Sequence, residues 1–467
     1  MTAQGETSNE DLVAGAKFDY ADLDDLTTKG TLSTGHTNFD DWAGLHSQYT
    51  DETKEGVAVP GRQIDGYFLD EDSQTTQTPG NSYGNKKYPY DSQFVVRFPN
   101  PDLWNGKLVI SGAPGVRGQY ANDFMISDFV LREGYAFAST DKGNSGLRFY
   151  SADKEPGAAM AKWHKRISQL TEAVKEAAEK HYGTRPHRTY ITGNSNGGYL
   201  TRYALEKHPK LYDGGVDWQG PLWTDPEGPA SDPDKGPNLL TFLPWAIKYY
   251  PHYRDTNSQA ARDVMILAGF EAESDFLWPY YYQIYWNLTQ RIYREEFDPY
   301  WWGGDADYNY LQRLDPQEDP IMHNPTVQNP LVKQALLERL QEQAQKIKQG
   351  VKDISLSGEI GKPLISLHGT LDALLPIKKS SDKYAELVKK AGHSDIHRYY
   401  KIEGGTHVDS LYDYFPDKLQ PILPCYRAAF DKLVKWVEDG SEPPASQLVE
   451  KPEREDVVNS CPALEDG

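Results

Sequence analysis

The chain has few cysteines, and their spacing argues against a metal site. Cys425 and Cys461 are the only two among 467 residues. They show neither Cys-x-x-Cys spacing nor a neighbouring histidine cluster, so the sequence predicts no zinc site. The two thiols are compatible with one disulfide that ties the C-terminal tail to the preceding helix. They are equally compatible with two free thiols, because sequence alone does not give the distance between them.

Positive charge and long apolar runs are also scarce. Lysine and arginine number 49 against 69 aspartates and glutamates, which gives a formal net charge of −20. Such a surface repels nucleic acid and anionic lipid, so neither is expected as a partner. No apolar run has the length needed to span a membrane. The polar first residues show no signal peptide, and both a cytoplasmic protein and a secreted protein without its leader fit. The oligomeric state is left open.

Core-forming material is plentiful, and it is arranged as alternating strands and helices. Hydrophobic residues make up 38% of the chain, which is enough for a packed core. Short β-branched or aromatic runs are predicted as strands at 93–98, 107–111, 134–139, 188–192, 213–218, 363–368 and 397–402. Helices are predicted at 161–182, 198–208, 331–348, 381–391 and 424–438. This alternation predicts an α/β fold, with a mostly parallel sheet covered by helices on both faces.

Composition also predicts the domain organisation. Residues 1–60 are polar and are expected to wrap over the surface as an N-terminal extension. Residues 61–222 and 356–440 carry the strand–helix alternation and form the core. The intervening 223–355 are rich in proline and aromatics and are expected to form a cap over the carboxyl ends of the strands. Residues 441–467 are expected to be an extended tail.

One motif has the form required of a reactive serine. Residues 193–197 read Gly-Asn-Ser-Asn-Gly and match G-x-S-x-G, with Ser195 at the centre. The motif needs a strand before it and a helix after it, so that a tight turn exposes the hydroxyl, and both are predicted here. The competing interpretation is a glycine-rich turn whose serine caps a helix.

A serine hydroxyl needs a base to become a nucleophile, and a later histidine and aspartate can supply one. Asp372 and His407 each lie on a loop directly after a predicted strand. The chain order Ser195, Asp372, His407 is the order typical of α/β-hydrolases. Three further aspartates are rival acids: Asp141, Asp217 and Asp409.

Attack on a carbonyl also requires donors for the developing oxyanion. The N–H of Asn196, directly after the serine, is the first expected donor. The second is expected from the glycine-containing loop at 111–115. Because Pro114 has no N–H, Ala113 is the candidate there, and Gly112 is the alternative.

The predicted cap has two notable features. Residues 242–310 are dense in tryptophan and tyrosine, which suit either a wall for a bulky substrate or the cap's own core. Residues 303–309 begin like a calcium loop but lack its central glycine and its final glutamate. We therefore expect no metal and no cofactor.

Several short runs resemble one family of the α/β-hydrolase superfamily. The runs Tyr182-Gly183, Ser195-Asn196-Gly197-Gly198 and 213–216 are similar to the tannase and feruloyl esterase family. The resemblance covers roughly 95–222 and 360–410, and the 3-hydroxybutyrate oligomer hydrolases are similar at the serine motif. Members of the first family usually join cysteines beside the serine and the histidine, whereas this chain has Asn194 and Thr406 there.

The resemblance implies an α/β-hydrolase fold and a serine esterase. Its triad would be Ser195, Asp372 and His407, acting on a small-molecule or oligomeric carboxylic ester through an acyl-enzyme. A bulky or aromatic substrate is expected, as for tannases. The alternatives are a hydrolase of hydroxyalkanoate oligomers or polyesters, a serine peptidase, and a non-catalytic binding protein with the same fold.

Overall fold

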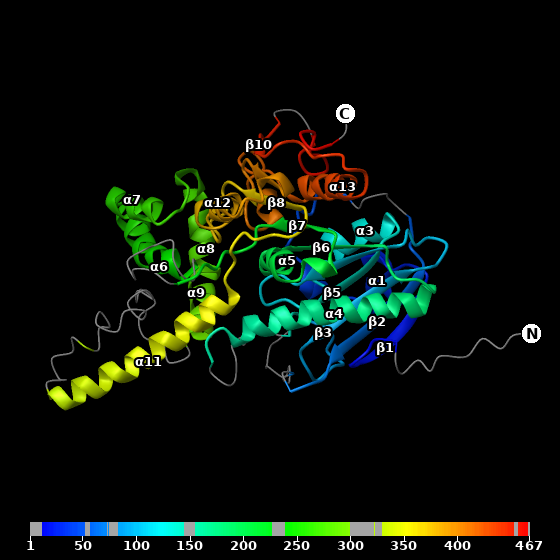
Figure 1. Cartoon of the computed structure of the whole chain (residues 1–467). Helices are drawn as coiled ribbons and strands as arrows, with labels where there is room; N and C mark the ends of the chain where they lie inside the picture. Colours follow the sequence, from blue (N-terminus) through cyan, green and yellow to red (C-terminus); the bar gives the residue numbers. More distant parts are fainter. Residues whose placement is uncertain are drawn as a thin grey trace, which may run out of the picture.

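The computed structural model shows one large sheet flanked by helices (Figure 1). The described residues are 12–51, 57–71, 73, 83–143, 155–226, 239–298, 322, 329–452 and 456–465. Within them, ten strands form one sheet in the order β1-β2-β3-β5-β4-β6-β7-β8-β9-β10.

The larger part of this sheet is parallel. It comprises β4 (Lys107–Gly112), β5 (Ala136–Thr140), β6 (Arg188–Asn194), β7 (Gly214–Trp218), β8 (Leu364–Gly369), β9 (His397–Ile402) and β10 (Gln447–Val449). Every residue of β5, β7 and β8 is buried, because side chains on both faces are covered. The mostly parallel sheet confirms the predicted fold class.

Antiparallel strands form the other edge, and the sequence analysis missed two of them. These strands are β1 (Ala16–Leu23), β2 (Gly61–Phe68) and β3 (Gln93–Pro99). The expected wrapping extension is therefore wrong in one respect, since β1 lies within residues 1–60 and pairs with β2 along its whole length. No residue of β1 is fully buried, so this edge strand lacks the apolar run that marks an inner strand.

Helices cover both faces and build a separate core on each. One face packs against α4 (Ala158–Tyr182), α5 (Asn196–Lys207) and α12 (Ser381–Ala391), and the other against α3 (Asp128–Arg132) and α13 (Leu423–Asp439). Strand β4 shows the alternation, because Leu108 and Ile110 belong to the first core and Val109 belongs to the second. None of the described helices is long and apolar enough to cross a membrane.

The segment predicted as a cap forms helices gathered beside one end of the sheet (Figure 1). They are α6 (Leu239–Thr256), α7 (Gln259–Leu267), α8 (Trp278–Ile284), α9 (Trp286–Phe297) and α11 (Pro330–Ile354). The sequence predicted only the last, because Pro244 and Pro251 lie inside α6 and aromatic residues obscure the period of the others. Trp278, Tyr281 and Trp286 are fully buried, in the same apolar core as α4 and the sheet face that it covers. The calcium-like run 303–309 lies outside the described residues.

A disulfide fixes the C-terminal segment. Cys425 of α13 is bonded to Cys461, with their Cα atoms 4.9 Å apart. Of the two alternatives left open by the sequence, the structure selects the disulfide. The predicted tail also supplies β10, which pairs with β9.

Candidate active site

Ser195 occupies a strained turn between β6 and α5. Its φ of 55° and ψ of −117° lie outside the usual regions for a residue with a side chain. The flanking glycines make the turn possible. A Cβ on Gly197 would lie 2.2 Å from the carbonyl oxygen of Gly112, and one on Gly193 would lie 2.6 Å from Gly197. The motif therefore needs both glycines because backbones approach too closely for any side chain.

The structure brings the three predicted residues into one hydrogen-bonded chain. The Nε2 of His407 lies 3.1 Å from the Oγ of Ser195, and its Nδ1 lies 2.8 Å from the Oδ2 of Asp372. The second carboxylate oxygen accepts the N–H groups of Leu374 and Leu375, each at 2.8 Å. Ser195, Asp372 and His407 are all buried. Strands β6, β8 and β9 lie close together in the parallel part of the sheet, with only β7 between β6 and β8. Their carboxyl ends therefore deliver these residues to one place.

The surroundings keep Asp372 ionised. Burial alone would raise the pKa of its carboxyl group, but His407 and His368 outweigh that effect and hold the pKa below its ordinary value. An ionised carboxylate keeps a proton on the Nδ1 of His407. The Nε2 then faces Ser195 as an acceptor.

The sequence analysis missed a second histidine at the same carboxylate. The Nε2 of His368 lies 3.4 Å from the Oδ2 of Asp372 and 2.8 Å from the carbonyl oxygen of Leu375. Its Nδ1 lies 2.7 Å from the hydroxyl of Ser381, which accepts a hydrogen bond from Arg202. The carbonyl oxygen of Leu375 can only accept, so Nε2 carries a proton, and in the neutral ring Nδ1 accepts from the hydroxyl of Ser381. The position of His368 at the end of β8, four residues before Asp372, was the available signal.

The rival acids have other partners. Asp217 forms a buried ion pair with Arg202 at 2.6 Å. Asp409 accepts the N–H groups of Ile422 and Leu423, each at 2.8 Å. Asp141 accepts the N–H of Gly143 at 2.7 Å. None of the three contacts the ring of His407 among the described residues.

The N–H groups free to act as candidate oxyanion donors are partly different from those expected. Asn196 is the first residue of α5, where a helix leaves its N–H groups without internal partners, so its N–H fits the expectation. Ala113 was the wrong candidate, because its N–H donates to the carbonyl oxygen of Thr140 at 3.0 Å. Gly112, the alternative, is part of β4. Gly115 and Val116 line the cavity beside Ser195 and carry the next N–H groups along this loop.

A cap residue fixes the side chain of Asn196. The hydroxyl of Tyr293, on α9, donates to its Oδ1 at 2.6 Å, and its Nδ2 donates to the carbonyl oxygen of Gly115 at 3.2 Å. The cap is thus joined to the turn that carries Ser195. Nothing in the sequence distinguished this contact, because Tyr293 is one of many aromatic residues in the predicted cap.

A cavity of about 300 Å³ opens beside Ser195. Its lining is mainly aliphatic and comes from the loop after β4, the loop after β8, the cap and the N-terminal segment. Of the cap aromatics, Tyr285 and Tyr293 reach it. Among the described residues, Arg117 is the only arginine or lysine in this lining, which contains no aspartate or glutamate.

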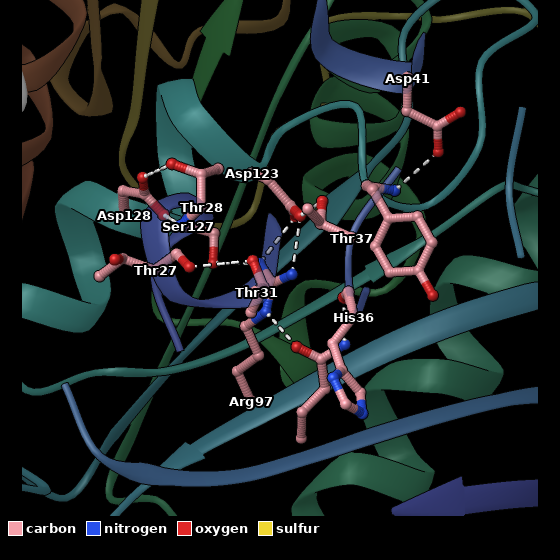
Figure 2. A network of polar contacts seen from close by, with 12 residues as sticks. Thr27, Thr28, Thr31, His36, Thr37, Asp41, Arg97, Asp123, Ser127 and Asp128 are labelled. Atoms are coloured by element: carbon pink, nitrogen blue, oxygen red, sulfur yellow. Dashed lines mark hydrogen bonds and ion pairs between the residues drawn. The ribbon is translucent and has the colours of Figure 1, made fainter. Parts of the chain in front are cut away.

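Buried polar contacts fix the N-terminal segment, residues 27–47, to the residues around the start of α3 (Figure 2). Thr28 donates to Asp128 from both its N–H and its hydroxyl, and Thr37 donates to Asp123 at 2.6 Å. Arg97 of β3 donates to both oxygens of Asp123. These contacts hold in place the segment whose Leu45 lines the cavity.

A third carboxylate, Asp41, joins the same segment to the loop that follows β4. It accepts the N–H of Gly84 at 2.9 Å and the N–H of Tyr120 at 3.2 Å. Burial raises its pKa to about 7, and these N–H groups only partly offset the rise.

Comparisons with known proteins agree with this geometry. The sequence model of the tannase and feruloyl esterase family matches residues 83–218, and that of the 3HB-oligomer hydrolases matches residues 318–466. Mono(2-hydroxyethyl) terephthalate hydrolase of Piscinibacter sakaiensis is 26% identical over 141 residues, covering 27% of this chain and 23% of that protein. D-(-)-3-hydroxybutyrate oligomer hydrolase of Paracidovorax citrulli is 26% identical over 129 residues, covering 26% and 18%.

These alignments span less than a quarter of the length of either relative. The crystal structure of an esterase from Aspergillus oryzae aligns with 92% of this chain and 88% of its own, at 13% identity and a TM-score of 0.46. The sheet and the two family matches together show an α/β-hydrolase fold, similar to the tannases and feruloyl esterases over residues 83–218 and to the 3-hydroxybutyrate oligomer hydrolases over residues 318–466.

Proposed function

We propose that this protein is a serine hydrolase that cleaves carboxylic esters through an acyl-enzyme. The observation that carries the proposal is the continuous hydrogen-bonded chain from Ser195 through His407 to Asp372, at 3.1 and 2.8 Å. It lies in the wall of a cavity that can admit an ester. The family matches support an ester as the substrate.

Each group has one role in this reaction. The Oγ of Ser195 attacks the ester carbonyl while the Nε2 of His407 takes its proton. Asp372 stabilises the resulting imidazolium. The N–H of Asn196, with one from Gly115 or Val116, binds the oxyanion. His407 then returns the proton to the leaving alcohol, and a water molecule activated by the same Nε2 releases the acid from Ser195.

The cavity lining favours an aliphatic substrate within this class. Leucine, isoleucine, valine and proline side chains dominate the lining, and its aromatic members are Tyr83, Tyr285 and Tyr293. The second candidate function is therefore hydrolysis of hydroxyalkanoate oligomers or aliphatic polyesters. Rates on aliphatic oligoesters, on aromatic esters and on peptides of matched length would separate it from a feruloyl-type esterase and from a peptidase.

Replacement of the nucleophile tests the main proposal. Ser195→Ala should lower the rate on a nitrophenyl ester by roughly four to six orders of magnitude. Ser33→Ala is the control, because Ser33 is exposed and bonds only to the carbonyl oxygen of Gly30. A fluorophosphonate should label the wild type and not the Ser195 variant. Full esterase activity in Ser195→Ala would refute the proposal, and absence of labelling in the wild type would favour a non-catalytic binding protein.

The disulfide also bears on the compartment. Disulfides persist in oxidising environments and are rare in the cytosol, so the Cys425–Cys461 bond supports an extracytoplasmic location. Alkylation of the protein in its native host, followed by mass spectrometry, would show both cysteines blocked if this location is right and both alkylated if it is wrong.

A further inference from the structure

We propose that Arg117 binds an anionic group of the substrate, so that the preferred substrates are esters that carry a free carboxylate. This inference rests on the proposed esterase function and narrows its substrate class. It starts from the contrast between the chain and its cavity. The chain has a net charge of −20, yet the described lining of the cavity contains no carboxylate and one arginine.

The guanidinium group of Arg117 is held firmly by one of its nitrogens. Its Nη1 lies 2.9, 2.8 and 3.1 Å from the carbonyl oxygens of Asp40, Asp41 and Ala43, at the end of α2 (Phe39–Trp42). The group also lies 5.4 Å from the centre of the ring of Tyr83, which lines the same cavity. These contacts fix the orientation of the side chain before any substrate arrives.

The opposite edge of the group is not used by the protein. Arginine has five N–H donors, and the Nε and Nη2 of Arg117 make no hydrogen bond to a described residue. No described carboxylate lies within ion-pair distance of it, so a carboxylate partner would have to come from the substrate. Nε and Nη2 together form the fork that donates to both oxygens of a carboxylate.

The place of Arg117 in the loop relates this fork to the reaction. It directly follows Val116, and Gly115 and Val116 carry the candidate oxyanion N–H groups. A substrate held at the oxyanion site therefore extends along the same loop towards the guanidinium group. The cavity wall is mainly aliphatic. The attraction between the guanidinium group and a substrate carboxylate is therefore screened less there than on an open surface.

Pairs of esters that differ only in charge test the proposal. On the acyl side, the monoethyl ester of a short dicarboxylic acid is compared with its amide analogue. On the alcohol side, an O-acetyl hydroxy acid is compared with its amide. We expect the wild type to prefer the carboxylate of at least one pair by roughly tenfold or more in kcat/KM. The pair that shows the preference identifies the side that faces Arg117.

Variants then assign the preference to this residue. Arg117→Gln should abolish the preference, because kcat/KM for the esters that carry a carboxylate should fall by roughly tenfold more than kcat/KM for their neutral amide analogues. Arg117→Lys should retain part of it, because lysine keeps the charge and loses the fork. Arg185→Gln is the control, since Arg185 is exposed, pairs with Glu179 and lies outside the cavity lining. Arg185→Gln removes one positive charge, as Arg117→Gln does, and should leave the preference for the carboxylate intact.

The outcomes separate this inference from the proposed function. Equal rates on both members of each pair in the wild type would overturn the inference while leaving the esterase proposal standing. An equal loss on charged and neutral esters in Arg117→Gln would also overturn it, because that result indicates a structural role. If no ester is cleaved, the esterase proposal fails. In that case, calorimetry measures binding of the dicarboxylic acid monoamide to the wild type and to Arg117→Gln. The inference requires that the wild type binds it and that the variant binds it more weakly.

Discussion

Replacement of His368 by asparagine should move the acidic limb of the kcat/KM profile to higher pH. The Nε2–H of His368 faces the Oδ2 of Asp372 at 3.4 Å, and the ring of His407 bonds to the same oxygen at 2.8 Å. The two rings therefore share one carboxylate oxygen. Asparagine is too short to reach that oxygen, so the carboxylate would give more of its charge to His407 and hold the proton on that ring more tightly.

The size of the shift follows from the geometry. At 3.4 Å the contact is longer than an ordinary hydrogen bond, and the same N–H also faces the carbonyl oxygen of Leu375 at 2.8 Å. Its contribution should therefore fall below the usual range for bonds to charged groups, at about 1 kcal/mol. Since one pH unit corresponds to about 1.4 kcal/mol, the limb should move by roughly 0.7 unit.

The assay is kcat/KM for a neutral ester between pH 4 and 9, with His368→Gln as the matched control. Glutamine can place an N–H near the position of Nε2, so its limb should remain close to that of the wild type. A merely structural role for His368 would lower kcat in both variants without moving the limb. A limb that moves to lower pH in the asparagine variant would refute the reasoning.

Two further predictions concern stability. Asp41→Asn should flatten the dependence of the melting temperature on pH. Burial raises the pKa of Asp41 to about 7 from 3.8. The stabilisation by its protonated form is therefore complete below pH 4 and is lost as pH rises through 7. Cys461→Ser should lower the free energy of unfolding by about 3–4 kcal/mol, since the bond to Cys425 closes a loop with a sequence separation of 36 residues. Melting curves at pH 4 to 8 and urea titrations measure the two effects.

Each of these predictions has a control in the same part of the chain. Asp40→Asn removes an exposed charge from the same short helix and should leave the pH dependence as it is. If melting temperature changed equally steeply with pH in the Asp41 and Asp40 variants, the first prediction would be contradicted. Reduction of the wild-type disulfide should reproduce the effect of Cys461→Ser. Unchanged stability on reduction would contradict the second.

The sequence predicted the elements whose signals are local. The serine turn needs two glycines at fixed spacing, and the inner strands are short apolar runs, so both were recognisable without a structure. The contact between His368 and Asp372 depends on how the loop after β8 turns back on its strand. Ala113 failed as a donor for a related reason, because its N–H is used by Thr140 of the neighbouring strand. Neither contact can be predicted from the sequence, because each depends on how the chain is arranged in the fold.

The cap helices and the edge strand β1 were harder to predict from the sequence for a different reason. Helix α6 contains two prolines, and aromatic residues spread around α8 and α9 conceal their apolar faces. Strand β1 is only partly buried, so its composition resembles that of a loop. The choice between a disulfide and free thiols required the separation of two chain segments, which only the fold supplies.

The position of the N-terminal segment has a consequence for how selectivity can change. Its Leu45 lies in the cavity wall, and the carbonyl groups of α2 orient Arg117. Neither the serine, the histidine nor the acid belongs to this segment. Substitution of Leu45 can therefore change which esters are accepted without replacing a residue of the triad. For library design this position is distinct from the triad, whereas a truncation of the stretch would also remove the carbonyl oxygens that accept from Arg117 and from the N–H of Asp409, two residues after His407.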